Sequence, residues 1–109
     1  MGKFVIIRKT AGKFQVQLKS KAGAVLLSSE EYTTKISCKK AIESFRTHAK
    51  QPDKYQKKIS TDWEPYFHLR SSHGKVIATS AIFPSTLSRE QAIKRVQRIA
   101  PNAVVQDQS

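Results

Sequence analysis

The chain has 109 residues and carries 20 Lys and Arg against eight Asp and Glu, a formal net charge of +12 at neutral pH. Its longest apolar run is far shorter than the ~18 residues that a membrane span needs, and Met1-Gly2-Lys3 leads directly into a strand-like segment, so we expect neither a membrane span nor a signal peptide. Cys38 is the sole cysteine, which excludes an intramolecular disulfide and makes the cytoplasm the expected compartment.

The first half of the sequence predicts three strands joined by short turns. A run rich in β-branched residues covers 4–7, apolar and polar residues alternate over 14–19, and a third apolar segment covers 24–29. Gly12 and Gly23 mark the two turns, because glycine supplies the positive φ that tight turns often require. These segments predict an antiparallel meander.

A helix follows, because the spacing of the apolar residues changes from two to about 3.6. Thr34 is the predicted N-cap, with Ser37 as the alternative, and Pro52 requires that the helix has ended. The apolar stripe that would face the core consists of Cys38, Ala41, Ile42, Phe45 and Ala49.

The second half follows the same plan. Strands are predicted near 55–59, 66–70 and 76–80, and Ser85 is the expected cap of a second helix that Pro101 ends. A last short strand is predicted over 103–105. The stripe of the second helix consists of Ala92, Ile93, Val96 and Ala100.

The two halves are copies of one unit, 51 residues apart. Leu18, Ser20, Gly23, Val25, Ser29, Ser37, Ala41, Ile42 and Ala49 recur without a gap as Leu69, Ser71, Gly74, Val76, Ser80, Ser88, Ala92, Ile93 and Ala100. A fixed period across turns, strands and a helix indicates a duplicated supersecondary unit. Residues 103–106 align with the start of the second copy, so the strand near residue 55 both closes the first copy and opens the second.

This arrangement predicts one α+β domain of two repeats, about 3–51 and 54–107. Each repeat alone would leave sheet edges unpaired, whereas two repeats can share one sheet and one layer of helices. We therefore expect two β-β-β-α-β repeats that form one antiparallel sheet with two helices on one face, as a monomer with pseudo-twofold symmetry.

The chain also resembles the YegP-like family of tandem-repeat proteins, a domain of unknown function. The residues that carry the resemblance in the first copy are Phe14, Leu18, Lys19, Gly23, Ser29, Glu30, Tyr32, Lys35, Ile42, Glu43, Ser44 and Ala49; in the second they are Pro65, Tyr66, Phe67, Leu69, Gly74, Ser80, Ile93 and Ala100. The resemblance implies that the repeats exchange their terminal strands, and it implies no activity, cofactor or catalytic residue. The departures from the family pattern include His48 and Ile99, where Asn is usual near the helix end.

Catalytic and metal-binding patterns are weak in this sequence. Cys38 lies on the apolar stripe, where a cysteine acts as a small hydrophobic residue, and neither a nucleophile elbow nor a phosphate-binding glycine loop occurs. His48, His68 and His73 lack the spacing of a zinc site; whether His68 and His73 share a site stays open. We expect a protein that is not an enzyme and uses no metal or cofactor.

A polar face of the predicted sheet is the main candidate for binding. Its side chains would be Gln15, Gln17 and Lys19 in the first copy and Tyr66, His68 and Arg70 in the second. Cations that follow phosphates and rings that stack on bases are typical of sheets that bind single-stranded nucleic acid. The alternative is a solvated sheet face whose cross-strand pairs only stabilise it.

Trp63 is unusual because it aligns with Gly12 in a turn. Two interpretations are open: the indole folds back onto the sheet, or it projects as a contact residue, since Trp is enriched in binding hot spots.

The sequence therefore favours a small basic binding or interaction module. One alternative is low-specificity binding of nucleic acid or another polyanion through the open sheet face; the second is association with a protein through a strand edge or Trp63. The candidate binding residues are Lys19, Lys58, Trp63, Tyr66, His68 and Arg70.

Overall fold

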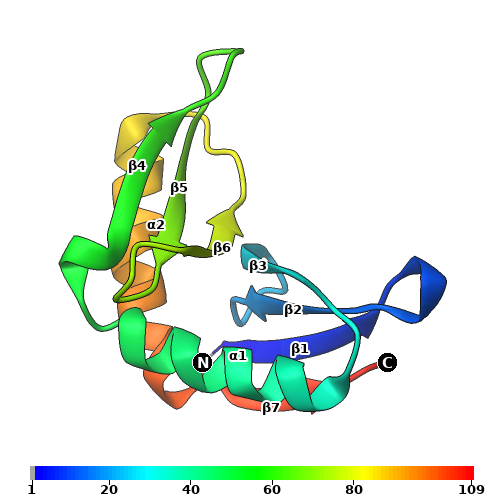
Figure 1. Cartoon of the computed structure of the whole chain (residues 1–109). Helices are drawn as coiled ribbons and strands as arrows, with labels where there is room; N and C mark the ends of the chain where they lie inside the picture. The colour runs from blue at the N-terminus through cyan, green and yellow to red at the C-terminus, as the bar shows by residue number, and fades with distance from the viewer. Residues whose placement is uncertain (1) are drawn as a thin grey trace.

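A computed structural model, which describes residues 2–109, contains one seven-stranded mixed sheet and two helices. The strand order is β4-β5-β6-β3-β2-β1-β7, and Figure 1 shows the elements along the chain. The elements are β1 (Lys3–Arg8), β2 (Phe14–Lys19), β3 (Val25–Tyr32), α1 (Lys35–His48), β4 (Tyr55–Ile59), β5 (Pro65–Arg70), β6 (Val76–Ser80), α2 (Thr86–Ile99) and β7 (Val104–Asp107).

The duplicated unit of the sequence is a duplicated unit of structure. β1, β2, β3 and α1 form the first half, and β4, β5, β6 and α2 form the second. The halves join where β3 pairs with β6 over three residue pairs. The strands of the two outer hairpins run in clearly different directions (Figure 1), because the twist between neighbouring strands accumulates across the sheet.

The terminal strands are exchanged between the halves, as the resemblance implied. β4 follows α1 of the first half but pairs with β5, and β7 follows α2 of the second half but pairs with β1. The expectation of an antiparallel sheet holds for every pair except β1–β7, which is parallel. The reason is that β7 enters at an outer edge after a helical crossover, which permits parallel pairing, whereas a short hairpin does not.

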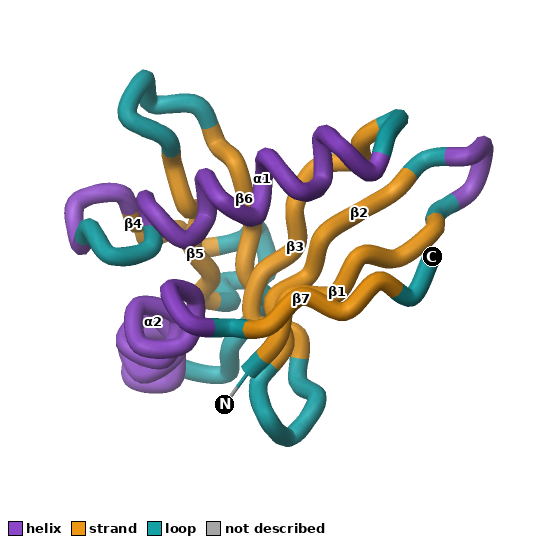
Figure 2. Tube along the Cα trace, turned by 90° about the horizontal axis from the view of Figure 1, so that it is seen from below, coloured by secondary structure: helices purple, strands orange, loops and turns teal. Residues whose placement is uncertain are grey.

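Both helices begin as the sequence predicts. The hydroxyl of Thr34 accepts a hydrogen bond from the Ser37 amide at 3.1 Å, and the hydroxyl of Ser85 accepts one from the Ser88 amide at 3.1 Å. Each hydroxyl satisfies one of the amides that a helix N-terminus leaves unpaired. Figure 2 views α2 nearly along its axis and α1 from the side, so the two helix axes are far from parallel.

One hydrophobic core lies between the sheet and the helices. It includes Phe4, Phe45 and Phe67, which are 0–2 % exposed, and Cys38, which is fully buried. Burial raises the pKa of the Cys38 thiol, because desolvation disfavours the thiolate. The predicted role of Cys38 as a small core residue is confirmed.

Polar contacts also join the halves at the ends of the helices. The Arg46 guanidinium of α1 donates to the carbonyls of Ala100 and Pro101, at 3.3 and 3.1 Å, just after α2. These contacts satisfy carbonyls at a helix C-terminus that would otherwise lack partners. Among residues 2–109, no helix is long and apolar enough to cross a membrane.

Candidate functional site

The β4–β5 hairpin brings four of the six candidate residues onto one surface. Lys58 lies opposite Tyr66 and Gln56 lies opposite His68 in the register of these strands. Because side chains alternate along a strand, Phe67 and Leu69 point into the core, where both are 0 % exposed, and the intervening residues point away from the helices. We call this surface the ring face; it consists of Gln56, Lys58, Tyr66, His68 and Arg70.

Two aromatic rings lie in contact on the ring face. The centroids of Tyr66 and His68 are 5.4 Å apart and the rings meet edge to face, a favoured geometry for aromatic pairs. Burial, with Lys58 and Arg70 nearby, lowers the pKa of His68. The imidazole is therefore neutral at pH 7, since its usual pKa of about 6.5 is already below that.

The His68 ring also has an unused polar atom. Its Nδ1 is enclosed and has no hydrogen-bond partner among the residues that the structure describes. A buried polar atom without a partner carries a desolvation cost. The ring is consequently held in place by packing rather than by a hydrogen bond at Nδ1.

The two cations of the ring face differ in their surroundings. The Arg70 guanidinium donates to Gln56 Oε1, with a distance of 2.7 Å from Nε, and also to the Gly74 carbonyl. Lys58 makes no ion pair within residues 2–109. Arg70 therefore has a defined position, and Lys58 is the cation available to an incoming anion.

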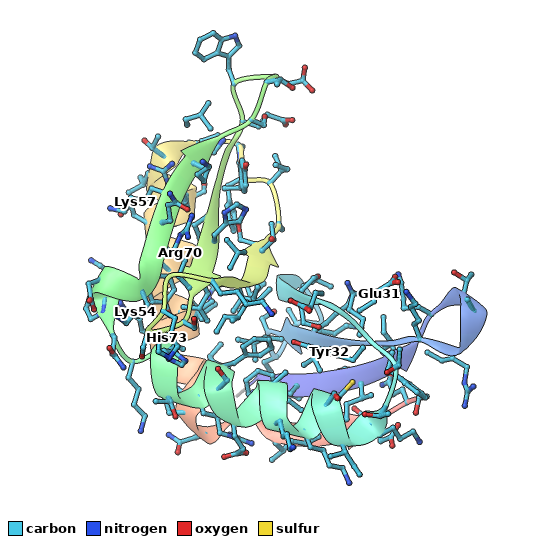
Figure 3. All side chains as sticks on the ribbon, viewed as in Figure 1. Glu31, Tyr32, Lys54, Lys57, Arg70 and His73 are labelled. Atoms are coloured by element: carbon cyan, nitrogen blue, oxygen red, sulfur yellow. The ribbon has the colours of Figure 1, made fainter. Side chains whose placement is uncertain are left out.

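Lys19 and Trp63 do not join this surface. Lys19 lies on β2, opposite Lys3 on β1, and β6 and β3 separate β2 from β5. The first half also carries an acidic group, Glu31, opposite Gln15. Figure 3 shows Arg70 on the second half and Glu31 on the first.

Trp63 occupies the turn between β4 and β5 with its indole in solvent. Its φ is +63° and it is 85 % exposed, and its amide donates to the Ser60 carbonyl at 3.0 Å. The interpretation that the indole folds back onto the sheet is therefore wrong. The turn fixes this residue in the left-handed region, and from there the side chain projects outward.

The histidines and the cysteine form no recognisable metal site. In the described part of the chain, no three His, Cys, Asp or Glu side chains are grouped so that they could hold an ion. His73 lies in the turn after β5, beside the end of α1 (Figure 3). His48 of that helix accepts from the Ser72 amide at 3.2 Å and contacts the Ser72 hydroxyl at the same distance.

The structure also reveals a basic groove that sequence reasoning missed. It lies between the end of α2 and the turn from β2 to β3, and it is lined by Gly2, Ser20, Lys21, Ala22, Arg95, Arg98 and Ile99. The available signal was the alignment of Ile99 with His48 at a position where both depart from the family pattern. That signal pointed to a difference between the halves but gave no neighbour for either residue.

Comparisons with known proteins identify relatives over nearly the whole chain. The domain of unknown function DUF1508 matches twice, at residues 10–56 and 60–107. The UPF0339 protein YegP of Escherichia coli K12 is 31 % identical over 106 residues, which is 97 % of this chain and 96 % of YegP. A UPF0339 protein from the ptx operon 5′ region of Stutzerimonas stutzeri is 34 % identical over 95 % of this chain and 94 % of its own length.

Solved structures agree with the fold. The NMR structure of E. coli YegP, a protein of unknown function, matches with a TM-score of 0.91 at 31 % identity, over 98 % of this chain and 92 % of that one. The NMR structure of a UPF0339 protein of Shewanella oneidensis matches with a TM-score of 0.90 at 30 % identity, over 97 % and 90 % of the two chains. The chain thus belongs to the YegP-like family of proteins with two DUF1508 repeats, whose function is unknown.

Proposed function

We propose that this protein is a non-enzymatic binding module that holds single-stranded nucleic acid on its ring face. The observation that carries the proposal is the composition of that surface, which has two rings in contact and one lysine without an ion pair among the described residues. Bases stack on aromatic side chains regardless of sequence, and lysines follow the phosphates. The matching surface of the first half has Gln15 and Gln17 in place of the rings.

The charges of the remaining molecule support an anionic partner. The net charge is +12, and a field of that sign raises the encounter rate with polyanions. The neutral state of His68 at pH 7 favours its use as a stacking ring rather than as a phosphate contact. Lys58, directly opposite Tyr66, is placed to meet the phosphate next to a base stacked on that ring.

The test is fluorescence anisotropy with labelled oligouridine and oligothymidine. We expect affinity that falls steeply with salt, because each phosphate contact releases counterions. The double variant Tyr66→Gln with His68→Gln gives the second half the residues of the first, and it should weaken binding at least about tenfold, since stacking is worth about 1–3 kcal/mol per base. The control is Gln15→Ala with Gln17→Ala, which should not change the affinity.

Either of two results would reject this function. One is the absence of binding at low salt. The other is equal affinity in the Tyr66→Gln, His68→Gln variant and the wild type, which would place any nucleic acid elsewhere on the basic surface.

A second candidate function rests on the exposed apolar side chains at the same end of the second half. Trp63 is 85 % exposed, Leu87 66 %, and Ile59 and Ile82 each 47 %. They belong to the end of β4, the hairpin turn, the loop after β6 and the start of α2, which Figure 1 shows at one end of the molecule. Exposed apolar side chains gathered on one surface are typical of protein interfaces.

This candidate predicts association that depends on Trp63. Sedimentation equilibrium of the wild type and of Trp63→Gly would show whether copies of the chain associate through this end. Concentration-dependent association that is lost in Trp63→Gly would favour a protein interface, and an unchanged mass in both would reject self-association here. The β7 edge, with Val104 67 % exposed, supplies the other surface from the sequence hypothesis, and Val104→Lys tests it in the same experiment.

A further inference from the structure

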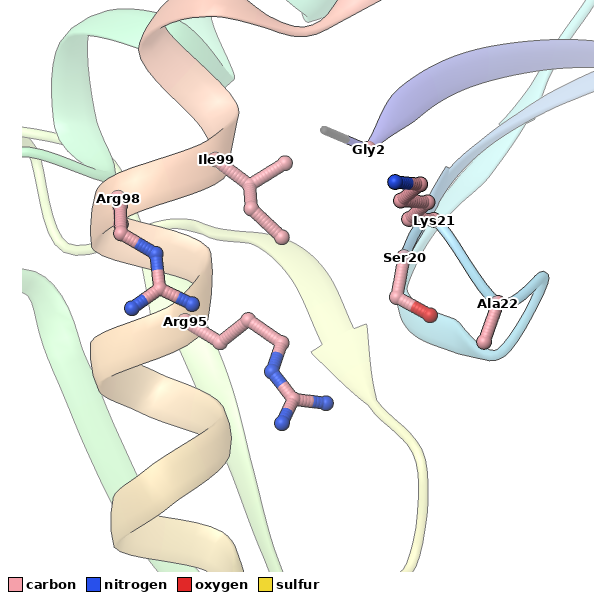
Figure 4. Close-up of a pocket in the computed structure, with 7 residues that line it drawn as sticks. All are labelled: Gly2, Ser20, Lys21, Ala22, Arg95, Arg98 and Ile99. Carbon is pink, nitrogen blue, oxygen red and sulfur yellow. The ribbon is translucent and has the colours of Figure 1, made fainter.

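We propose that the groove between the end of α2 and the β2–β3 turn is a binding site for a phosphate monoester. The groove has a volume of about 450 Å³. Figure 4 shows Arg95 and Arg98 on the helix side, and Ser20, Lys21 and Ala22 on the turn side. The site is separate from the ring face, so the proposal goes beyond the function argued above.

The groove concentrates positive charge that the protein does not neutralise. Three of its seven lining residues are Lys21, Arg95 and Arg98, and none is acidic. Within residues 2–109, every ion pair involves other cations. A bound anion would neutralise this charge.

The equivalent place, between the end of α1 and the β5–β6 turn, is bridged by a side chain, which shows that the open groove is not required by the fold. There, His48 of α1 reaches the turn after β5 and contacts both the amide and the hydroxyl of Ser72 at 3.2 Å. Its Nδ1 also contacts the Ser44 hydroxyl at 3.1 Å. Ile99 takes the place of His48 in the second half, and it makes no such polar link to the turn.

Each cation of the groove replaces a neutral residue of the closed site, which lies between the end of α1 and the β5–β6 turn. With the 51-residue offset, Lys21 corresponds to Ser72, Arg95 to Ser44 and Arg98 to Thr47. The three cations come from both halves of the chain, and they gather at the one of the two equivalent places where the histidine bridge is missing. The substitutions together therefore point to a ligand.

The chemistry of the lining residues favours phosphate with an organic group attached. Guanidinium groups bind phosphate oxygens in a bidentate manner, and three cations suit a dianion better than a single carboxylate. The Ser20 hydroxyl accepts from the Ala24 amide at 3.2 Å, which leaves its proton free to donate to an oxygen. Ile99 and Ala22 supply an apolar wall against which the organic part of a monoester would pack.

A phosphate monoester can come from two sources, a free small molecule or the phosphorylated end of a nucleic acid. The experiment is a heteronuclear NMR titration of the full chain with inorganic phosphate, with uridine monophosphate and with uridine. A second arm compares short oligouridines with and without a terminal phosphate. We expect uridine monophosphate, but not uridine, to shift the amides of Gly23 and Ile99. Equal shifts by both would overturn the proposal.

Variants separate the site from the general charge. Arg95→Gln and Arg98→Gln should each weaken binding of uridine monophosphate at least about tenfold. Lys94→Gln, which removes the same charge from the neighbouring helix position outside the groove, should change it less than about twofold. Equal losses in all three variants would overturn the proposal, because they would indicate unspecific attraction. Arg95 and Arg98 are exposed, so the amide spectrum of each variant should remain that of a folded protein.

The oligouridine arm identifies the source of the phosphate. Preference for the phosphorylated oligomer over uridine monophosphate supports a nucleic-acid end in the groove, and the reverse supports a free small molecule. Tyr66→Gln with His68→Gln leaves the groove intact, so loss of ring-face binding in that variant does not affect this test. Conversely, Arg95→Gln does not alter the ring face, and the two proposals can fail independently.

Discussion

The two halves of the molecule share their buried serine contacts and their helix caps, and they differ on the open face of the sheet. Ser29 and Ser80 make the same buried contacts, and the caps Thr34 and Ser85 have the same geometry. On the open sheet face, however, Gln17 corresponds to His68. The comparison teaches that these local contacts recur in both halves, while the side chains on the open sheet face and around the helix ends do not.

The largest expected loss of stability concerns the two buried serines, which make the same contact in both halves. The Ser29 hydroxyl accepts from the Val16 amide and the Ser80 hydroxyl from the Phe67 amide, both at 2.9 Å. Ser29→Ala or Ser80→Ala leaves a buried amide without an acceptor, so each should lower the free energy of unfolding by about 1–3 kcal/mol. Urea denaturation measures both. If the two serines are equivalent, both variants should lose a similar free energy of unfolding. A loss in one variant with none in the other would contradict this.

The helix caps should contribute equally as well. Thr34→Ala and Ser85→Ala each remove the acceptor for one amide of the first helical turn, and each should cost about 1 kcal/mol of stability. The losses should add in the double variant, because distant sites are independent. Thr33→Ala, at the exposed position before the first cap, is the matched control for methyl and hydroxyl removal. Strongly unequal costs would show that one helix depends on its cap and the other on packing.

The pH dependence of stability should come in part from His68 of the second half, whose counterpart Gln17 does not titrate. Its pKa is lowered in the folded protein by burial and by Lys58 and Arg70, while in the unfolded chain it is about 6.5. As the pH falls below about 6.5, the unfolded state binds a proton first and stability is lost, until the pH is below the folded pKa. His68→Gln, which copies Gln17, should make stability between pH 7 and pH 5 less dependent on pH.

Urea denaturation at several pH values checks this expectation. The matched control, Gln17→Ala, should keep the pH dependence of the wild type, since it removes no titrating group. If His68→Gln also keeps it, the folded and unfolded pKa values of His68 are alike, and the ring is more hydrated than its enclosed Nδ1 indicates.

Much of the fold could be predicted because it depends on local periodicity. The alternation of Phe14, Val16 and Leu18 fixes which face of β2 is buried. Thr34 and Ser85 cap their helices through amides only three residues further along the chain. The same alternation placed Tyr66, His68 and Arg70 on the open face of the sheet, together with Lys19 of the first half, which the structure sets apart from them. These signals need no information on how distant segments meet.

The remainder depends on contacts between distant segments. β7 runs parallel to β1 because α2 ends at that edge of the sheet. The residues of β7, 104–107, do not determine this direction by themselves. The groove arises because the end of α2 approaches the β2–β3 turn. Arg95 and Lys21 therefore line the same groove although 74 positions separate them in the sequence. Periodicity describes the elements separately and gives no distance between such groups.

The smallest expected change in stability concerns the β1–β2 and β4–β5 turns, which carry side chains of different size at the same position. Gly12 and Trp63 both have positive φ, +71° and +63°. For a residue other than glycine this conformation costs roughly 1–2 kcal/mol, and an indole that is 85 % exposed recovers little of it by burial.

Trp63→Gly relieves this strain but adds roughly 0.5–1 kcal/mol of chain entropy to lose on folding. The net change should be a small stabilisation, between zero and about 1.5 kcal/mol, measurable by urea denaturation, with Gly12→Ala as the reverse substitution in the first half. A destabilisation by Trp63→Gly would mean that the indole packs on the protein in solution; an unchanged or higher stability leaves a contact with a partner as the use of this side chain.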